Sequence, residues 1–176
     1  RVIEPEKAFE ISLTENISQE PMHPADAFVA YQSMVTQGLT VEAIASKFGV
    51  KVIQVLRRLR MANVAPELFQ LYRNDAMTLD QIMALATVDD HERQLGVWNS
   101  LSSHNRQPHT IKRRLTEDEI VDTDVRVQAI GLENYLAAGG SVRTDLFSEE
   151  GTQYLTDPAL VDRMLGEKLE AMAAVV

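Results

Sequence analysis

Residues 39–64 constrain the fold more than any other stretch, because their pattern predicts two short helices joined by a glycine turn. Apolar side chains recur at helical spacing before the turn, at Ile44 and Phe48, and recur again after it. The small side chain of Ala45 suits a close crossing of two helices, and Gly49 suits a left-handed turn. The stretch therefore predicts a helix-turn-helix, although a purely structural corner between two helices has a similar pattern.

Helix-start signals place further helices around this motif. Pro66 suits the first position of a helix, and Thr78 begins a capping box. Asp89 or Asp90 suits the start of the next helix. We therefore expect a mainly α fold, with a multi-helix domain that contains the helix-turn-helix over residues 21–101.

The rest of the chain predicts a smaller, α-rich accessory region. Residues 1–20 lack periodicity and are expected to be a linker or remnant of an upstream N-terminal domain. A polar joint separates the helical domain from residues 102–176, where the extended pieces 142–147 and 152–155 predict a β-hairpin. Asp157, followed by proline, predicts the start of a long amphipathic C-terminal helix.

The distribution of charge matters because the chain as a whole is acidic, with a net charge of -9 over 176 residues. A negative total alone argues against nucleic-acid binding. However, residues 1–114 contain 13 acidic and 13 basic side chains, whereas residues 115–176 contain 13 acidic and 4 basic ones. Between Lys47 and Arg60 there are five cations and no acidic residue. Since surface charges are screened beyond about 8 Å at physiological salt, the acidic C-terminal region does not cancel this patch.

The second helix of a helix-turn-helix places its N-terminal end in the major groove of DNA. We expect Lys51, Val52, Gln54, Arg57 and Arg58 to face outward, while the orientation of Ile53 stays open. Arg or Lys can contact guanine, Gln can contact adenine, and Val can contact only a thymine methyl group. For Arg60, phosphate contact and simple solvation of the helix end are equally compatible with the pattern. The candidate DNA-binding residues are Thr40, Lys47, Lys51, Val52, Gln54, Arg57, Arg58 and Arg60.

A second basic cluster follows the polar joint, in a stretch from Leu95 to Leu115 without an acidic residue. Its candidate phosphate contacts are Arg106, His109, Lys112, Arg113 and Arg114. The alternative is a solvated face whose cations pair with the acidic residues 117–119. Together, the two clusters would form a broader DNA-facing surface.

The order of these features resembles ParB, the plasmid and chromosome partitioning family, over residues 12–101. Residues 15–24 resemble the family's ENxQR stretch and the helix start that follows it, and residues 27–34 resemble its Glu-Ala-Tyr helix. Residues 39–64 resemble its helix-turn-helix, and residues 67–86 resemble the next two helices. Three places depart from the family. Gln19 stands where the family has arginine, residues 51–53 replace Ser-Arg-Ser, and residues 80–83 replace Gly-His-Ala-Arg.

The resemblance implies binding to palindromic, centromere-like sites in double-stranded DNA, as a homodimer in the full-length protein, with a partition ATPase as partner. It also implies CTP and magnesium for a full-length protein. Only Glu15 and Asn16 match the nucleotide-binding residues, as a weak remnant, and the rest of that pocket would precede Arg1. We therefore expect no cofactor, no metal and no CTP hydrolysis in this chain.

Other functional classes find little support in the residues. The absence of cysteine excludes disulfides, thiolate zinc sites and a cysteine nucleophile. The acidic cluster 89–92 suits a helix start, and no phosphate loop or nucleophile elbow occurs. With no membrane span or leader in the sequence, we expect a cytoplasmic protein associated with the nucleoid or a plasmid, and not an enzyme.

The leading hypothesis is sequence-specific DNA binding in plasmid or chromosome partition. Two alternatives stay open. One is a helix-turn-helix transcriptional repressor, and the other is a helical protein-interaction module whose helix-turn-helix is only structural.

Overall fold

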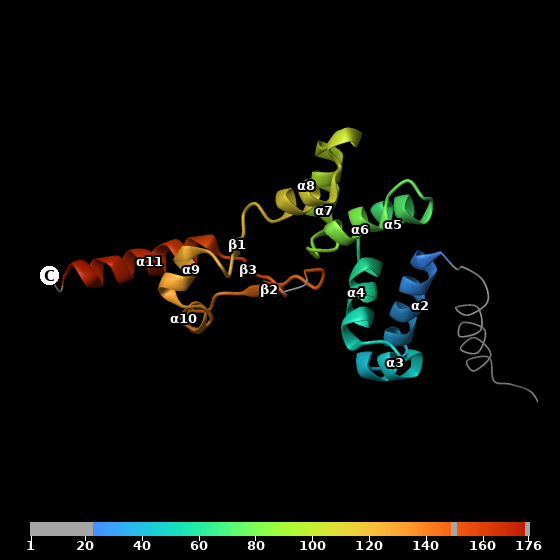
Figure 1. Cartoon of the computed structure of the whole chain (residues 1–176), viewed down its shortest axis with the longest axis horizontal. Coiled ribbons are helices and arrows are strands. Elements are labelled where there is room, and N and C mark those ends of the chain that lie inside the picture. The colour runs from blue at the N-terminus through green and yellow to red at the C-terminus, as the bar shows by residue number, and fades with distance from the viewer. Residues whose placement is uncertain (1–22, 149–150, 175–176) are drawn as a thin grey trace, which may run out of the picture. The chain divides into compact units, whose positions relative to one another are not determined.

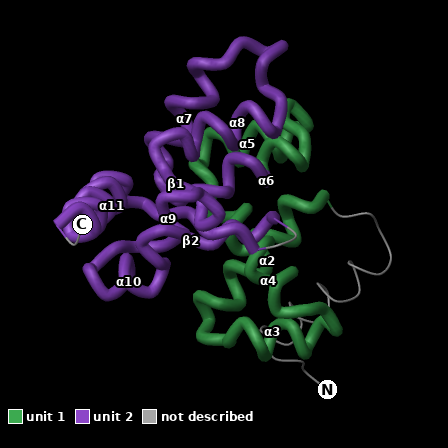
Figure 2. The backbone as a smooth tube through the Cα atoms, turned by 60° about the vertical axis from the view of Figure 1, so that its left-hand side comes forward, with its two compact units in different colours: residues 1–82 green, residues 83–176 purple. Residues whose placement is uncertain are grey.

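The computed structural model describes residues 23–148 and 151–174. Within these residues the chain has ten α-helices, one short 3-10 helix and a three-stranded antiparallel sheet (Figure 1). It divides into two compact units, residues 1–82 and 83–176 (Figure 2). The predicted mainly α fold, with a helix-turn-helix and a β-hairpin, is confirmed.

The first unit consists of short helices with strong local start and stop signals. Its helices are α2 (Pro24–Thr36), α3 (Val41–Phe48), α4 (Val52–Ala62), α5 (Pro66–Arg73) and the first part of α6 (Leu79–Leu85). Proline stands at the first position of α2 and of α5, where its missing N–H leaves no helical hydrogen bond unmade. The capping box before α6 is confirmed, because Thr78 Oγ1 accepts from the Gln81 amide at 3.3 Å and Gln81 Oε1 accepts from the Thr78 amide at 2.9 Å.

The helices α2, α3 and α4 enclose one hydrophobic core. Tyr31 and Met34 of α2 pack with Ile44 and Ala45 of α3 and with Val55 of α4. Ile44 and Val55 are fully buried, and burying a side chain of this size contributes about 1.5 to 3 kcal/mol. The apolar periodicity of the motif therefore holds α4 against the other two helices and fixes which of its faces stays open.

Helix α5 packs against α2 through aromatic and charged side chains. The rings of Phe28 and Tyr72 stack with centroids 5.9 Å apart, and Arg73 Nη2 lies 2.5 Å from Asp26 Oδ1. Burial, together with the nearby charge of Asp75, raises the pKa of the Tyr72 hydroxyl above its ordinary value. These contacts make α5 part of the same unit as the helix-turn-helix.

The second unit contains the remaining helices and the sheet. Its elements are the end of α6, α7 (His91–Ser100), the 3-10 helix η1 (Ser103–Asn105), α8 (Pro108–Leu115), β1 (Ile120–Val121), α9 (Val125–Ile130), α10 (Leu132–Ala137), β2 (Val142–Thr144), β3 (Gln153–Leu155) and α11 (Pro158–Ala173). As predicted, Asp90 caps α7 and Asp157 caps α11. Each carboxylate accepts a hydrogen bond from a backbone amide three residues later.

The division between the two compact units falls after Ile82, inside α6. Within the second unit, α7 packs directly against α8. The Arg106 guanidinium lies 4.1 Å from the centre of the Trp98 ring and donates to the carbonyls of Trp98 and Leu101, each at 3.2 Å. The polar stretch after Leu101 therefore connects two helices that pack against each other.

The predicted hairpin exists, and a strand that was not predicted completes the sheet. β2 and β3 pair antiparallel, with Val142 opposite Leu155, and the two-residue strand β1 adds Ile120 on the other side of Leu155. The strand order is β1-β3-β2. The hydroxyl of the fully buried Tyr135 donates to the Ser141 carbonyl at 3.2 Å and accepts from the backbone amide that precedes α11 at 3.1 Å. This tyrosine therefore joins α10, the hairpin and the start of α11.

Candidate nucleic-acid interface

The turn between α3 and α4 is built by local backbone interactions. Thr40 Oγ1 caps α3 by accepting from the Ala43 amide at 3.2 Å. Gly49 has a φ of 63°, and the Val50 amide donates to the Ala45 carbonyl at 3.0 Å. Because this turn needs so few residues, only three residues separate the end of α3 from the start of α4. The two helices therefore form the tight corner of a helix-turn-helix.

The N-terminal end of α4 is exposed. Lys51, Val52, Ile53 and Gln54 all face solvent, whereas Val55 is fully buried. The orientation of Ile53, which the sequence left open, is thus outward, with 37% of the residue surface exposed. The helix therefore presents four consecutive side chains at the position from which a recognition helix contacts base edges.

Electrostatics at this helix end are unusual for a helix start. The first turn of α4 contains no acidic residue, and Lys51 occupies the N-cap position. Acidic side chains normally stabilise the partial positive charge of a helix N-terminus, and a lysine does not. Gln54 Oε1 supplies the cap by accepting from the Lys51 amide at 3.0 Å. The result is a positively charged helix end with a neutral cap, which suits the approach of a phosphate backbone.

The basic residues farther along α4 are partly buried. Arg58 differs from the expected outward orientation, because its Nη1 donates to the Tyr31 hydroxyl at 2.6 Å and its guanidinium lies 4.9 Å from the centre of that ring. Arg57 and Arg60 are half-buried, and each takes part in an interaction with the surrounding structure. Arg58 therefore ties α4 to α2, and Tyr31 is a contributor that the sequence pattern did not single out.

Helix α3 adds two exposed polar side chains, one at each end of the helix. Thr40 is exposed at the helix start, and Lys47 is exposed in the last turn, where a cation also complements the partial negative charge of the helix end. Together with the four exposed residues at the start of α4, they make up the candidate surface. We refer to residues 40, 47 and 51–54 below as the α4 surface.

The second basic cluster, on and before α8, is mostly engaged within its own unit. Lys112 Nζ lies 2.5 Å from Asp145 Oδ2, and the side chain of Asp145 is completely buried. Arg114 forms an ion pair with Glu117 at 3.3 Å, as the alternative of a self-paired face predicted. His109 and Arg113 are exposed, as is the paired Arg114. Of the five candidate phosphate contacts, including Arg106 stacked on Trp98, three have partners inside the protein.

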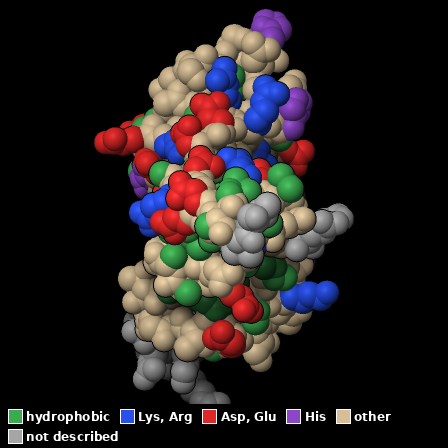
Figure 3. Space-filling model, turned by 90° about the vertical axis from the view of Figure 1, so that its left-hand side faces the viewer, with side chains coloured by type: hydrophobic (Ala, Val, Ile, Leu, Met, Phe, Trp, Pro, Cys, Tyr) green, Lys and Arg blue, Asp and Glu red, His purple; other side chains and the backbone are tan. Residues whose placement is uncertain are grey.

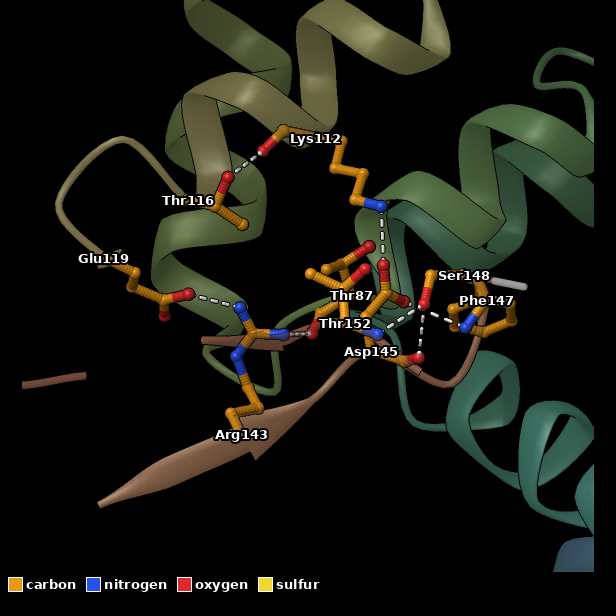
Figure 4. A network of polar contacts seen from close by, with 9 residues as sticks. All are labelled: Thr87, Lys112, Thr116, Glu119, Arg143, Asp145, Phe147, Ser148 and Thr152. Carbon is orange, nitrogen blue, oxygen red and sulfur yellow. Dashed lines mark hydrogen bonds and ion pairs between the residues drawn. The ribbon is translucent and has the colours of Figure 1, made fainter. Parts of the chain in front are cut away.

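Arg143 and Asp145 form a polar network that the sequence did not predict (Figure 4). Arg143 Nη1 donates to the Thr87 carbonyl at 2.5 Å, and its Nη2 pairs with Glu119. Asp145 Oδ1 also accepts from the Phe147 amide at 2.9 Å. Apart from Phe147, the partners are far apart in sequence, so no local spacing signals them. The network ties the hairpin to α8 and to the segment after α6.

Acidic and basic side chains mix on the exposed surface. Figure 3 shows Asp and Glu side chains in view, with Lys and Arg among them. One of the mixed clusters on the surface is Asp124, Arg126 and Asp162, where Arg126 pairs with both carboxylates at 3.0 Å. The hydrogen bonds from the Arg126 side chain, and then from its backbone amide, lower the pKa of Asp124 below its ordinary value.

The candidate nucleotide-binding remnant, Glu15 and Asn16, lies outside the residues that the structure describes. Among the described residues, no group of three or more His, Asp or Glu side chains is arranged to hold a metal ion. No helix within the described ranges is long and apolar enough to cross a membrane.

Comparison with known proteins identifies the family. The family model of the ParB HTH domain matches residues 20–119, more than half of the chain. The chain belongs to the ParB HTH domain family. The resemblance seen in the sequence is confirmed, and this ParB-like chain carries a DNA-binding helix-turn-helix domain. The matched residues include the α4 surface and α8, and they end just before β1.

Relatives among curated proteins agree with this assignment. The chain is 32% identical to YubM of Escherichia coli O157:H7 over 178 residues, and 31% identical to YubM of the K12 strain, in each case covering 98% of the chain and 27% of the relative. It is 27% identical over 111 residues to the chromosome-partitioning protein Spo0J of Thermus thermophilus, covering 62% of the chain and 41% of that protein. The chain thus spans about a quarter of the length of YubM. No solved structure matches.

Proposed function

We propose that this ParB-like chain binds a specific sequence in double-stranded DNA through the α4 surface, and that it serves plasmid or chromosome partition by marking a centromere-like site. The observation that carries the proposal is the exposed, acid-free N-terminal end of α4, held out by the core of the helix-turn-helix. The Thermus relative is a chromosome-partitioning protein by name, which supports the partition role.

The residues divide into two roles in this proposal. Thr40 and Lys47 on α3 contact phosphates, since short polar side chains and lysines in this position fix a protein on the DNA backbone. Lys51, Val52 and Gln54 face the base edges in the major groove.

The basic residues farther along α4 support the α4 surface. Arg58 acts chiefly by fixing the angle of α4 through Tyr31, because its guanidinium already contacts that ring and hydroxyl. We assign phosphate contacts to Arg57 and Arg60, whose side chains are half-buried beside it.

In this proposal, the second basic cluster, on and before α8, contributes less to DNA binding than its number of basic residues predicts. Arg113 and His109 are exposed on α8 and remain candidate phosphate contacts. Lys112, Arg114 and Arg106 pair with Asp145, Glu117 and Trp98 respectively, so recruiting them to DNA would first break internal contacts. We therefore assign the main binding energy to the α4 surface.

The decisive experiment selects bound duplexes from a random DNA pool with the full chain and then measures the dissociation constant of the enriched sequence against salt. We expect an enriched sequence. We also expect the logarithm of the affinity to fall linearly with the logarithm of the salt concentration, with a slope of about 0.9 per phosphate contact. Lys51→Ala should weaken binding to the enriched duplex. Arg163→Ala, which removes one exposed positive charge from α11 in the other unit, is the matched control and should leave binding unchanged.

Two outcomes would reject the proposal. If the pool yields no enriched sequence and no salt-dependent binding, the helix-turn-helix is a structural corner and the chain is a protein-interaction module. If binding is specific but Lys51→Ala and Arg163→Ala weaken it equally, the α4 surface is not the interface.

The partition role and the dimer need separate measurements. A plasmid that carries the enriched sequence should be retained for more generations without selection when the full-length protein is present. A palindromic enriched sequence would support a dimer, as would a stoichiometry of two chains per duplex. Repression of a reporter without any effect on plasmid retention would favour the repressor alternative.

A further inference from the structure

Two of the four exposed side chains at the N-terminal end of α4 are apolar. Val52 is 40% exposed and Ile53 is 37% exposed, although both are β-branched hydrophobic residues. Val55, only a few positions later in the same helix, is fully buried. The core of α2, α3 and α4 therefore does not use these two side chains, and packing within the unit does not account for them.

The polar side chains beside them are less available for base contacts than their types imply. A glutamine that recognises adenine needs its amide oxygen as an acceptor and its amide nitrogen as a donor. The oxygen of Gln54 already accepts from the Lys51 amide at 3.0 Å, as the cap of the helix. Arg58 is likewise held by Tyr31. Polar readout by the first turn is thus restricted to donors, namely the Lys51 ammonium and the Gln54 amide nitrogen.

The positive surroundings of the two apolar side chains point to DNA as their partner. Lys51 directly precedes them, Lys47 is exposed in the last turn of α3, and the first turn of α4 contains no acidic residue. A purely apolar protein partner would gain nothing from these cations, whereas DNA requires them for its phosphates. In the major groove, the apolar group available to a hydrophobic side chain is the methyl group on C5 of thymine.

We infer that Val52 and Ile53 recognise the C5 methyl groups of thymines, so that the DNA site is specified in part by methyl contacts. The inference rests on the proposed function and adds the chemical class that the α4 surface selects. Neighbouring helical positions point about 100° apart, so the two side chains reach different base pairs. The site then contains a thymine opposite each of them.

Deoxyuridine tests this inference because it differs from thymidine only by the missing methyl group. Each thymine of the enriched duplex is replaced singly by deoxyuridine, and binding of the full chain is measured by fluorescence anisotropy. At one or two positions the dissociation constant should rise about fourfold, which corresponds to ~0.8 kcal/mol for burying one methyl group. At the other thymines it should change less than about twofold, because no apolar side chain meets the methyl group there.

The variant Val52→Ala tests whether this side chain makes the contact. With Val52→Ala, one of the sensitive positions should lose its preference for thymine over deoxyuridine, because the partner of the methyl group is gone. Val35→Ala removes a similarly exposed valine from α2, 39% exposed, and should keep the full preference. Both substitutions lie on the surface, so neither is expected to unfold the chain.

The outcomes separate this inference from the proposed function. Specific binding that is insensitive to deoxyuridine at every position overturns the methyl contact and leaves the proposed function intact. A loss of self-association of the chain in Val52→Ala, with the deoxyuridine effect unchanged, assigns the patch to a protein contact and also overturns it. Failure to enrich any sequence overturns both.

Discussion

The helices α4 and α8 are both rich in basic residues, yet their charges have different surroundings. At the start of α4, Lys51 is exposed and no acidic residue lies in the first turn. On α8, Lys112 is bound to the buried carboxylate of Asp145, and Arg114 pairs with Glu117. The comparison teaches that the number of cations in a segment does not measure its capacity to bind DNA. What matters is whether the protein has already supplied their counter-charge.

The sharpest test of this comparison is to break the ion pair between Lys112 of α8 and Asp145. Lys112→Met removes the ammonium from a buried carboxylate, which keeps its hydrogen bond from the Phe147 amide. The free energy of unfolding of the second unit should fall by about 3 kcal/mol, since the buried carboxylate of the pair is left without its counter-charge. Urea unfolding followed by circular dichroism measures it.

A double variant serves as the control for that loss. Asp145→Asn combined with Lys112→Met removes both charges and should recover most of the stability, whereas salt-dependent DNA binding should match the original chain throughout. If Lys112→Met unfolds at the same urea concentration as the original chain, the pair is not structural, and the contrast between the two helices disappears.

The next largest effect is expected from a substitution in the turn between α3 and α4. Gly49→Ala places a side chain on a residue with a φ of 63°, where an added Cβ would meet no atom within 4 Å. The cost is therefore that of the left-handed backbone, about 1 to 2 kcal/mol of unfolding free energy.

Gly96→Ala is the matched control for this change, because Gly96 lies inside α7 and also has open space around it. That substitution should stabilise the chain by about 0.8 to 1 kcal/mol, since alanine favours a helix interior over glycine. Thermal unfolding of the two variants should shift in opposite directions. Equal shifts would contradict the role given to the turn.

The salt dependence of DNA binding compares the α4 surface with α8 directly. Lys47→Ala, which removes a proposed phosphate contact of the α4 surface, should lower the slope of logarithmic affinity against logarithmic salt by about 0.9. Arg114→Ala should leave the slope unchanged, because its guanidinium is paired with Glu117. A smaller slope for Arg114→Ala, with no change for Lys47→Ala, would reverse the comparison and place the interface on α8.

The smallest effect concerns acid stability at an exposed ion pair. Arg126 lowers the pKa of Asp124, so the folded state favours the charged carboxylate. Its contribution is present above the ordinary aspartate pKa of about 4 and is lost as the pH falls through the lowered folded pKa. Between about pH 6 and about pH 2, Asp124→Asn should therefore lose less stability than the original chain in urea unfolding. A steeper loss in the variant would contradict the assignment.

Local signals in the sequence predicted the helices well. Pro66, Thr78, Asp90 and Asp157 act on their own or the next few backbone groups, so their effect needs no distant partner. The glycine turn at Gly49 belongs to the same class. The strand β1 was missed because a two-residue strand has no periodicity to detect, and it exists only through its pairing with β3.

The sequence predicted the exposed side chains at the start of α4, but not which basic side chains already have partners inside the protein. Spacing alone placed Lys51, Val52 and Gln54 on the outer side of α4, where the structure has them exposed. The same spacing placed Arg58 there too, and only the packing of α2 shows that Tyr31 holds it. The orientation of a helical face follows from periodicity, whereas the partner of a long side chain depends on which helix lies beside it.

By itself, the sequence determined the helix-turn-helix, the family to which the chain belongs and the separation of an acidic C-terminal region from a charge-balanced remainder. These properties depend on residue type and on short spacing along the chain. Only the tertiary structure decided which cations are neutralised, because Asp145 and Lys112 meet through folding and not through proximity in sequence. Coulombic attraction falls off with distance in space, so the role of each charge follows from the fold.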